Sequence, residues 1–302
     1  MNVVAAEDPV ERRRGLIALA AVQLAFGLFP VFGKEAFHAF APGAVAAWRV
    51  AVGAAVLLGI AVARHGRRAL PPRALLPRLA VCSLLGVALN QGLFLEGLSR
   101  TKAVNTGLVM CIIPVATYGF AVLLRQEAHD RRRSLGIVLA IAGTVPLLLE
   151  GEGAPLEGDS LGVALVIANA LCYSLYLVLS KPLLGRLPTL VVIAWVYALS
   201  LPAAPWFARG RELAPSLEGN ERAWGALAFV LVFPTVLAYL WNTYALKRVR
   251  ASTVAFFVFL QPLVSGLGGV LVLGEELLPS TWITAAMLLV AMGLVVVRRQ
   301  RS

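Results

Sequence analysis

The stretch Leu28-Phe-Pro-Val-Phe-Gly-Lys34 returns 147 residues later as Leu175-Tyr-Leu-Val-Leu-Ser-Lys181. The same offset aligns Trp48 with Trp195. Further along, an offset of 148 residues aligns Leu98, Ala103, Pro114 and Glu127 with Leu246, Ala251, Pro262 and Glu275. Matches that keep their order and spacing indicate an internal duplication, because chance identities in a biased composition would not do so.

The composition around these matches is that of a membrane protein. Of the 302 residues, 59% are hydrophobic and 14% are charged, and the mean hydropathy is +0.82. Soluble domains carry about 25% charged residues, so a single water-soluble core, a disordered chain and a collagen-like repeat are all excluded. The net charge of +11 does not indicate a nucleic-acid partner, because the basic residues lie in short clusters between apolar runs.

Long apolar stretches predict how often the chain crosses the bilayer. A spanning helix needs about 20 mostly apolar residues, and no stretch alternates at the period of a barrel strand. We therefore predict an all-α polytopic membrane protein with ten transmembrane helices. These helices are expected at residues 15–37, 43–63, 75–98, 102–124, 134–149, 160–180, 189–208, 223–246, 252–273 and 280–297.

The basic residues predict the orientation. With an internal N-terminus, twenty lysines and arginines fall in cytoplasmic segments and six fall in external ones. Positive residues concentrate on the cytoplasmic side, so both termini are expected there. Abundant arginine and alanine beside little lysine suggest a GC-rich genome, which favours a bacterial inner (plasma) membrane. The external segment 150–159, at the midpoint of the chain, carries four acids and no base, as expected.

Five crossings in each half have a topological consequence. Because five is odd, the second half starts on the opposite side of the membrane, so the halves are predicted to be inverted repeats. Inverted repeats are typical of secondary transporters, whose substrate site lies near the membrane midplane between the repeats.

Short motifs at matching places in the two halves carry a family resemblance. The first set is Glu96-Gly-Leu-Ser-Arg-Thr-Lys-Ala103, Pro114 and Leu124-Arg-Gln-Glu127, and the second is Tyr244-Ala-Leu-Lys-Arg-Val-Arg-Ala251, Gln261-Pro262 and Leu273-Gly-Glu275. From about residue 15 to residue 297 the chain resembles the EamA family of the drug/metabolite transporter superfamily. This resemblance implies a ten-helix exporter or permease for small metabolites, amino acids among them.

We expect five segments on this basis. They are a cytoplasmic tail (1–14), a first EamA repeat (15–150), an acidic external linker (151–159), a second EamA repeat (160–297) and a basic cytoplasmic tail (298–302).

Arg49 is the one basic residue more than three residues from either end of a predicted span, and it lies about six residues into the second. A guanidinium can clamp a substrate carboxylate or phosphate through two hydrogen bonds. The alternative is a structural arginine that reaches the interface or pairs with Glu96. Glu96 itself is expected to form a surface pair with Arg100 one turn away, and a proton-coupling role for it is the weaker reading.

Amides and tyrosines inside the spans are the other substrate-binding candidates. Amides suit a polar neutral or zwitterionic substrate, although any single one could instead bond two helices together. Tyrosines deep in a span can stack on a ring or a cation, and Tyr173 shares a helix face with Asn169. Together with Arg49, the predicted substrate-binding residues are Gln23, Asn90, Gln91, Asn169, Tyr173, Tyr239, Asn242 and Gln261.

Pro114 and Pro262 occupy equivalent positions in mid-span. Each removes a backbone donor and kinks its helix, so the pair could serve as hinges of a rocking motion or as plain packing kinks.

No nucleotide-binding loop, dinucleotide fingerprint or metalloprotease motif occurs in the chain, so we expect no enzyme, cofactor or metal site. The leading hypothesis is a secondary exporter of small polar metabolites that works as a monomer or weak homodimer among membrane lipids. An exchanger of phosphorylated or nucleotide-linked sugars is the first alternative, and an intramembrane enzyme for lipid-linked intermediates is the second.

Overall fold

The computed structural model describes residues 9–149, 160–246, 248, 257–258 and 260–296, and the part of the chain so described is helical without strands. The predicted linker 151–159, the tail residues 1–8 and the tail 298–302 lie outside the described residues. In the first half the main helices are α1 (Pro9–Ala36), α2 (Pro42–His65), α3 (Leu76–Ser83), α4 (Leu89–Arg100), α5 (Ala103–Val109), α6 (Ile112–Leu123) and α7 (Arg131–Leu149). In the second half they are α8 (Ser160–Leu184), α9 (Thr189–Ala198), α10 (Ala204–Ala208), α11 (Glu221–Val232), α12 (Ala238–Leu246), α14 (Leu260–Leu273) and α15 (Pro279–Val296).

Several of these helices join into segments that are long and apolar enough to cross a bilayer. Among the described residues seven such spans occur, and two shorter apolar helices, Leu260–Leu273 and Thr281–Leu294, follow them. The seven spans are Pro9–Ala36, Pro42–Ala69, Arg73–Arg100, Ala103–Leu123, Ser160–Leu184, Thr189–Ala208 and Glu221–Ala245. The predicted all-helical, multi-pass membrane protein is therefore confirmed at this level.

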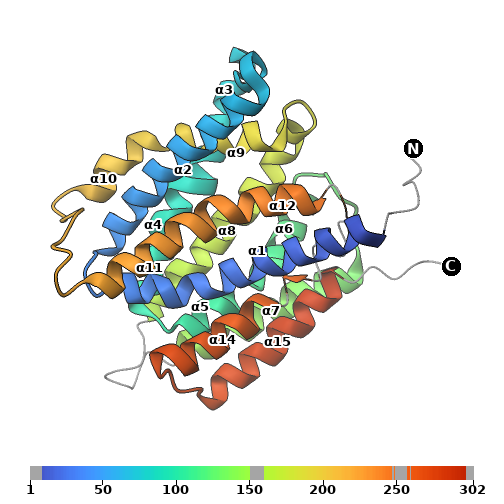
Figure 1. Ribbon diagram of the computed structural model, residues 1–302. Helices are drawn as coiled ribbons and strands as arrows, with labels where there is room; N and C mark the ends of the chain where they lie inside the picture. The colour runs from blue at the N-terminus through green and yellow to red at the C-terminus, as the bar shows by residue number, and fades with distance from the viewer. Residues whose placement is uncertain (1–8, 150–159, 247, 249–256, 259, 297–302) are drawn as a thin grey trace.

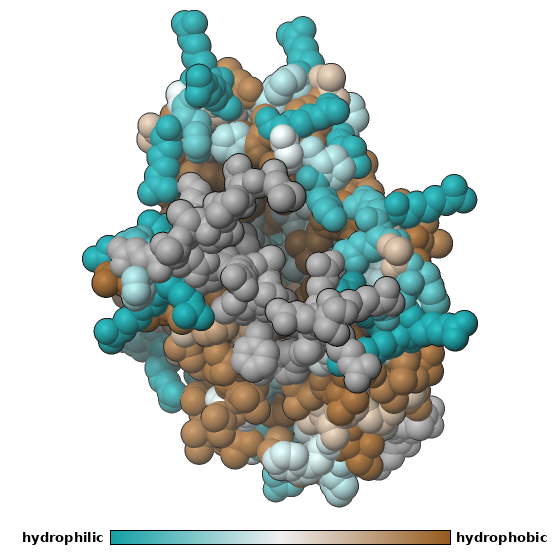
Figure 2. Space-filling view, turned by 90° about the vertical axis from the view of Figure 1, so that its right-hand side faces the viewer, coloured by the Kyte–Doolittle hydropathy of each residue, from teal (hydrophilic) through white to brown (hydrophobic). Residues whose placement is uncertain are grey.

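Large apolar side chains cover the outside of the bundle. On α14 and α15, Leu267, Leu271, Trp282 and Ile283 are all more than half exposed. Seen from the end where α1 begins, apolar side chains make up the lower flank, and hydrophilic side chains project from the upper and lateral rim (Figure 2). An apolar flank of this kind is stable against lipid tails and unstable in water.

The helices of the two halves pack against one another rather than into two separate bodies. α1 lies between α12 and α14, as Figure 1 shows, and α8 packs against both α4 and α6. α2 packs on α9, α5 packs on α14, and α7 packs along α15. The first residues of α1 and the last of α15 lie at the same end of the bundle (Figure 1).

Two spans contain a π-helical turn at matching places. Leu84–Ala88 joins α3 to α4, and Phe233–Leu237, 149 residues later, joins α11 to α12. A π turn inserts one extra residue into a helix, and such turns occur frequently at functional sites because they rotate the side chains that follow. Here the residues that follow include Asn90, Gln91 and Tyr239.

A tight turn of the backbone lies directly before each candidate hinge proline. The predicted fourth span divides into α5 and α6, and Pro114 stands three residues into α6. At the break the Ile113 N–H donates to the Met110 carbonyl over 3.1 Å, and the Gln261 N–H donates to Val258 in the same way, also over 3.1 Å. Proline cannot donate to the carbonyl four residues before it, so each chain turns more tightly at that point.

Candidate functional site

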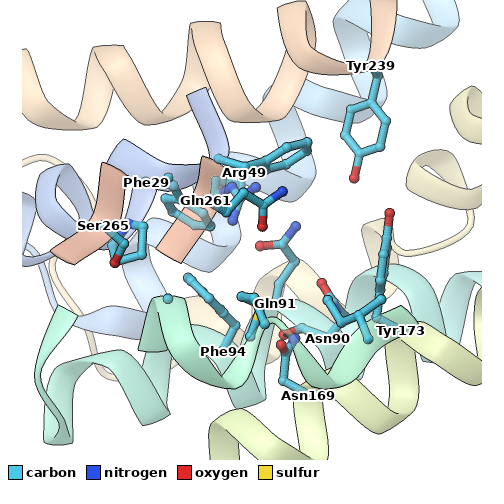
Figure 3. A pocket seen from close by; sticks show the side chains of 16 residues that line it. Phe29, Arg49, Asn90, Gln91, Phe94, Asn169, Tyr173, Tyr239, Gln261 and Ser265 are labelled. Atoms are coloured by element: carbon cyan, nitrogen blue, oxygen red, sulfur yellow. Dashed lines mark hydrogen bonds between the residues drawn. The ribbon is translucent and has the colours of Figure 1, made fainter. Parts of the chain in front are cut away.

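A cavity of about 130 Å³ lies in the middle of the bundle, between helices of both halves (Figure 3). Phe26 and Phe29 of α1, Phe94 of α4 and Met110 form part of its apolar wall. Its polar lining consists of Arg49, Asn90, Gln91, Asn169, Tyr173, Tyr239, Gln261 and Ser265.

Arg49 of α2 is held rigidly at this cavity. Only 3% of the residue is exposed. Its guanidinium carbon lies 4.0 Å from the centre of the Phe29 ring. Its Nε donates to Thr235 Oγ1 over 2.8 Å. Thr235 lies in the second π turn and donates its own proton to the Val230 carbonyl, so its oxygen is free to accept from Arg49. The guanidinium is thereby fixed through Nε, and the Tyr197 hydroxyl is a further hydrogen-bonding neighbour. A guanidinium can pair with an anion through two of its N–H groups.

The amides at the cavity come from both halves of the chain and serve different purposes. Gln261 Nε2 donates to Gln23 Oε1 over 2.6 Å, so Gln23 supports Gln261 from behind the cavity wall. Asn169 Nδ2 donates to the Asn90 backbone carbonyl over 2.8 Å and so bonds α8 to α4. Gln91 lies opposite, and its buried Oε1 accepts no hydrogen bond from the described residues.

Two tyrosines close the far side of the cavity. Figure 3 shows the hydroxyl groups of Tyr173 and Tyr239 directed into the same space. The Tyr239 ring stands edge-on to Tyr197 with 5.8 Å between ring centres, and Tyr173 lies 5.5 Å from Tyr176. These neighbours hold the two rings in place by aromatic packing.

Glu275, the residue after the loop glycine that follows α14, bonds three spans together. Its carboxylate accepts hydrogen bonds from the N–H groups of Ala103 (2.6 Å) and Val104 (3.0 Å) at the start of α5. Lys34 at the end of α1 lies 3.4 Å from the same carboxylate, whose side chain is 8% exposed. A carboxylate at a helix N-terminus satisfies free donors and complements the helix dipole. We call this arrangement the Glu275 junction.

The Glu275 junction continues to the cavity through α14. Ser265, which lines the cavity, donates from Oγ to the Ala103 carbonyl over 2.6 Å. A Cβ atom on Gly269 would lie 2.5 Å from Glu275 Oε2, so a glycine is needed there for the carboxylate to fit. α5 and α14 are thus joined along the whole distance from the junction to the cavity.

The matching residue of the first half, Glu127, has a different environment. It accepts a hydrogen bond from Arg133 Nη1 over 2.9 Å and its side chain is 35% exposed. In the same loop Asp130 caps α7, and the hydrogen bond from the backbone N–H of Arg133 holds the pKa of Asp130 below its ordinary value. The contacts described for Glu127 therefore stay within this loop.

Most of the residues predicted to bind substrate meet at the cavity. Arg49, Asn90, Gln91, Asn169, Tyr173, Tyr239 and Gln261 line it; Gln23 supports Gln261; and Asn242 of α12 is not among the lining residues. The alternative in which Arg49 pairs with Glu96 is wrong, because Glu96 bonds Arg100 over 2.8 Å, as the surface-pair prediction stated. Thr235, Phe29 and Ser265 were not predicted.

No group of three or more metal-ligating side chains occurs in the part of the chain that the structure describes. Cys82 and Cys111 are buried and unbonded, and the described acids lie in loops or near helix ends. The cavity offers one positive charge, several amides and hydroxyls, and an apolar wall.

The comparisons with known proteins match this chain to membrane transporters. The model of the EamA-like transporter family matches residues 13–149 and again residues 160–297. An uncharacterized transporter of Bacillus subtilis, YyaM, is 28% identical over 231 residues, which is 75% of each chain. A second transporter of that organism, YwfM, is 28% identical over 86% of this chain and 87% of its own.

More distant relatives extend the comparison. A WAT1-related protein of Arabidopsis thaliana is 24% identical over 70% of this chain and 66% of its own. One solved crystal structure shares the fold with a TM-score of 0.62 and 20% identity, over 93% of this chain and 96% of the other.

Proposed function

The chain belongs to the EamA-like transporter family, and from that premise we propose that it is a secondary transporter that exports small polar metabolites, with amino acids among the candidates. Membership makes it a multi-pass membrane transporter. The substrate, the direction and the mechanism are our proposal, and each rests on particular residues.

The observation that carries the proposal is the buried arginine in a cavity shared by both halves. A charge within a spanning segment is costly and usually faces the interior or a wet cavity, where it serves a substrate or an ion. Arg49 lies there beside amides of the first half (Gln91) and of the second (Gln261). A small solute with an anionic group and a hydrogen-bonding group matches this set.

The helix contacts support two inverted five-helix repeats. In the duplication α1 corresponds to α8, α4 to α12, and α6 to α14. Exchanging the halves therefore converts the α4–α8 contact into α1–α12 and the α6–α8 contact into α1–α14, and all four contacts occur. The pairs α2–α9, α5–α14 and α7–α15 are each converted into themselves. The matched π turns obey the same exchange. Such repeats give two related arrangements of one gate, which is the basis of alternating access.

In the proposed cycle the Glu275 junction closes one end of the cavity while the other end exchanges substrate. The tight turns before Pro114 and Pro262 serve as the hinges, because each contains a cavity-lining residue: Ile113 in one case and Gln261 in the other. The charge distribution of the sequence favours cytoplasmic termini, and in that orientation we propose that the Glu275 junction lies at the external side of a bacterial plasma membrane.

The competing functions receive less support from the cavity. An exchanger of phosphorylated or nucleotide-linked sugars needs several cations for its substrate, and Arg49 is the single cation among the described lining residues. An intramembrane enzyme needs clustered acids, histidines or cysteines, and the described residues contain no group of three.

The proposal is tested by a substrate screen with the purified chain in liposomes, run with and without a pH gradient. We expect saturable uptake of one class of small polar solute. The R49A variant should reduce that uptake about 100-fold, since removing one partner of a buried charge pair costs about 2–5 kcal/mol. Arg222, which is 88% exposed and distant from the cavity, provides the control variant R222A. Equal uptake by R49A and the unchanged chain would contradict the role of Arg49, and no uptake of any class would contradict the function.

A further inference from the structure

The cavity carries a net charge of its own. Among its described lining residues Arg49 is the one ionised side chain, and no acid lies beside it. The described acids nearest in sequence to cavity elements have other partners: Glu96 bonds Arg100, Glu35 lies 3.8 Å from Arg222, and Glu275 belongs to the junction. The guanidinium is therefore held by the Phe29 ring and by the hydroxyls of Thr235 and Tyr197, all of them neutral, so the site itself carries a charge of +1.

This charge discriminates between substrate classes. A monoanion brings the loaded cavity to zero, whereas a zwitterion leaves it at +1 and a dianion changes it to −1. A buried charge without a counter-charge is strongly unfavourable in a low-dielectric interior. The neutral loaded state is the one that crosses the closed intermediate of a transport cycle most readily.

The remaining walls define the rest of the substrate. Gln91 is 2% exposed, and its Oε1 has no hydrogen-bond partner among the described residues, so it calls for a donor from the ligand. Phe94, Met110 and Ile113 offer an apolar surface on the same cavity. The cavity volume of 130 Å³ is close to the ~150 Å³ of a cavity that accepts benzene, so a ligand of similar size fits inside it.

We infer that the site takes small monoanions that combine one carboxylate-type group, a neutral hydroxyl or N–H donor and a short apolar group, and that each cycle moves one negative charge across the membrane. This inference rests on the proposed transport function and narrows it, because it sets zwitterionic amino acids aside as the preferred cargo. In a cell whose interior is negative, the membrane potential alone drives such an anion outward. The driving factor is about fifty-fold for each 100 mV, or about 2.3 kcal/mol.

Three isosteric probes separate charge from shape. L-Valine is a zwitterion, 2-hydroxy-3-methylbutanoate is a monoanion with a hydroxyl donor, and 2-hydroxy-3-methylbutanamide is neutral. Each has eight non-hydrogen atoms and the same branched apolar group. The full chain is reconstituted in liposomes, each radiolabelled probe is loaded inside, and a potassium gradient with valinomycin sets the potential to either sign. Protein-free liposomes give the leak of each probe.

We expect the monoanion to leave fastest, and an interior-negative potential to accelerate its exit at least tenfold over an interior-positive one. The R49Q variant should lose this exit, whereas R222Q, altered at an exposed arginine, should keep it. Valine exit that is as fast and independent of the potential would overturn the inference and leave the transport function standing. If none of the three probes is transported, the inference is judged on the solute that the wider screen identifies. A monoanion whose flux follows the membrane potential supports the inference, and a solute of any other net charge overturns it. A chain that moves no solute at all overturns both.

Discussion

The two glutamates that match in the repeat, Glu275 and Glu127, have different structural roles. Glu275 is almost fully buried, accepts two backbone hydrogen bonds from α5 and lies beside Lys34 of α1. Glu127 is one-third exposed, and its described partner is Arg133, six residues away. One residue joins three spans and the other fastens one loop. Repeated sequence therefore does not mean repeated contacts. In the cycle that we propose, this asymmetry distinguishes the end of the cavity that Glu275 closes from the other end.

The largest effect is expected from removing the carboxylate of the Glu275 junction. E275A leaves two N–H groups at a buried helix start without an acceptor, which should lower the free energy of unfolding by about 2–3 kcal/mol. E127A removes a partly exposed ion pair worth about 0.5 kcal/mol. Apparent melting temperatures of both variants in detergent measure the difference. Equal losses would show that the two glutamates are equivalent after all.

A smaller effect is expected from filling the space beside Glu275. In G269A the new methyl group would meet Glu275 Oε2 at 2.5 Å and push the carboxylate from α5, at a cost of about 1–2 kcal/mol. Gly266 is the matched control, because it lies one turn away on α14 and a Cβ there meets nothing within 4 Å. G266A should be neutral or slightly stabilising, as alanine favours helix over glycine. If G269A and G266A have the same melting temperature, the Glu275 junction is not tightly packed.

The smallest effect concerns the backbone that leads to each glutamate. The backbone N–H of each glutamate donates to the carbonyl of the residue six positions earlier. Glu275 donates to Gly269, and Glu127 donates to Ala121. The positive φ that such a helix end requires falls on Gly274 (67°) in one half and on Arg125 (56°) in the other. R125G should therefore stabilise the chain by up to about 1 kcal/mol relative to R125A, which keeps the strain but lacks the side chain. A melting temperature that is equal or lower for R125G would contradict this.

Much of the site could be predicted because polar residues stand out in apolar spans. Arg49, Gln91 and Gln261 were identifiable for that reason, and the parity of five crossings indicated that both halves share one cavity. Phe29 could not be predicted from the sequence, because one phenylalanine among many apolar residues indicates nothing about the guanidinium that it contacts. Thr235 was equally hidden, because its orientation depends on a π turn.

Tertiary packing, which the sequence does not reveal, also explains why the predictions for Gln23, Asn242 and Glu275 were incomplete. Gln23 was predicted as a ligand-binding amide, but which of two facing amides reaches the cavity depends on the rotation of α1 against α14. Asn242 lies three residues beyond the lining residue Tyr239 on α12 and is itself not among the lining residues. Glu275 could be placed at a helix end from sequence, yet its bonds to α5, more than 170 residues away, arise from tertiary packing.

The most direct test of the account measures the distance across the Glu275 junction in liposomes. With the three native cysteines replaced by alanine, spin labels are attached at S99C on α4 and V272C on α14, two exposed positions. Pulsed electron resonance should give one short distance for the junction-intact protein, a longer population in E275A, and no change in E127A. A distance distribution that E275A leaves unaltered would contradict the claim that Glu275 holds this end of the cavity closed.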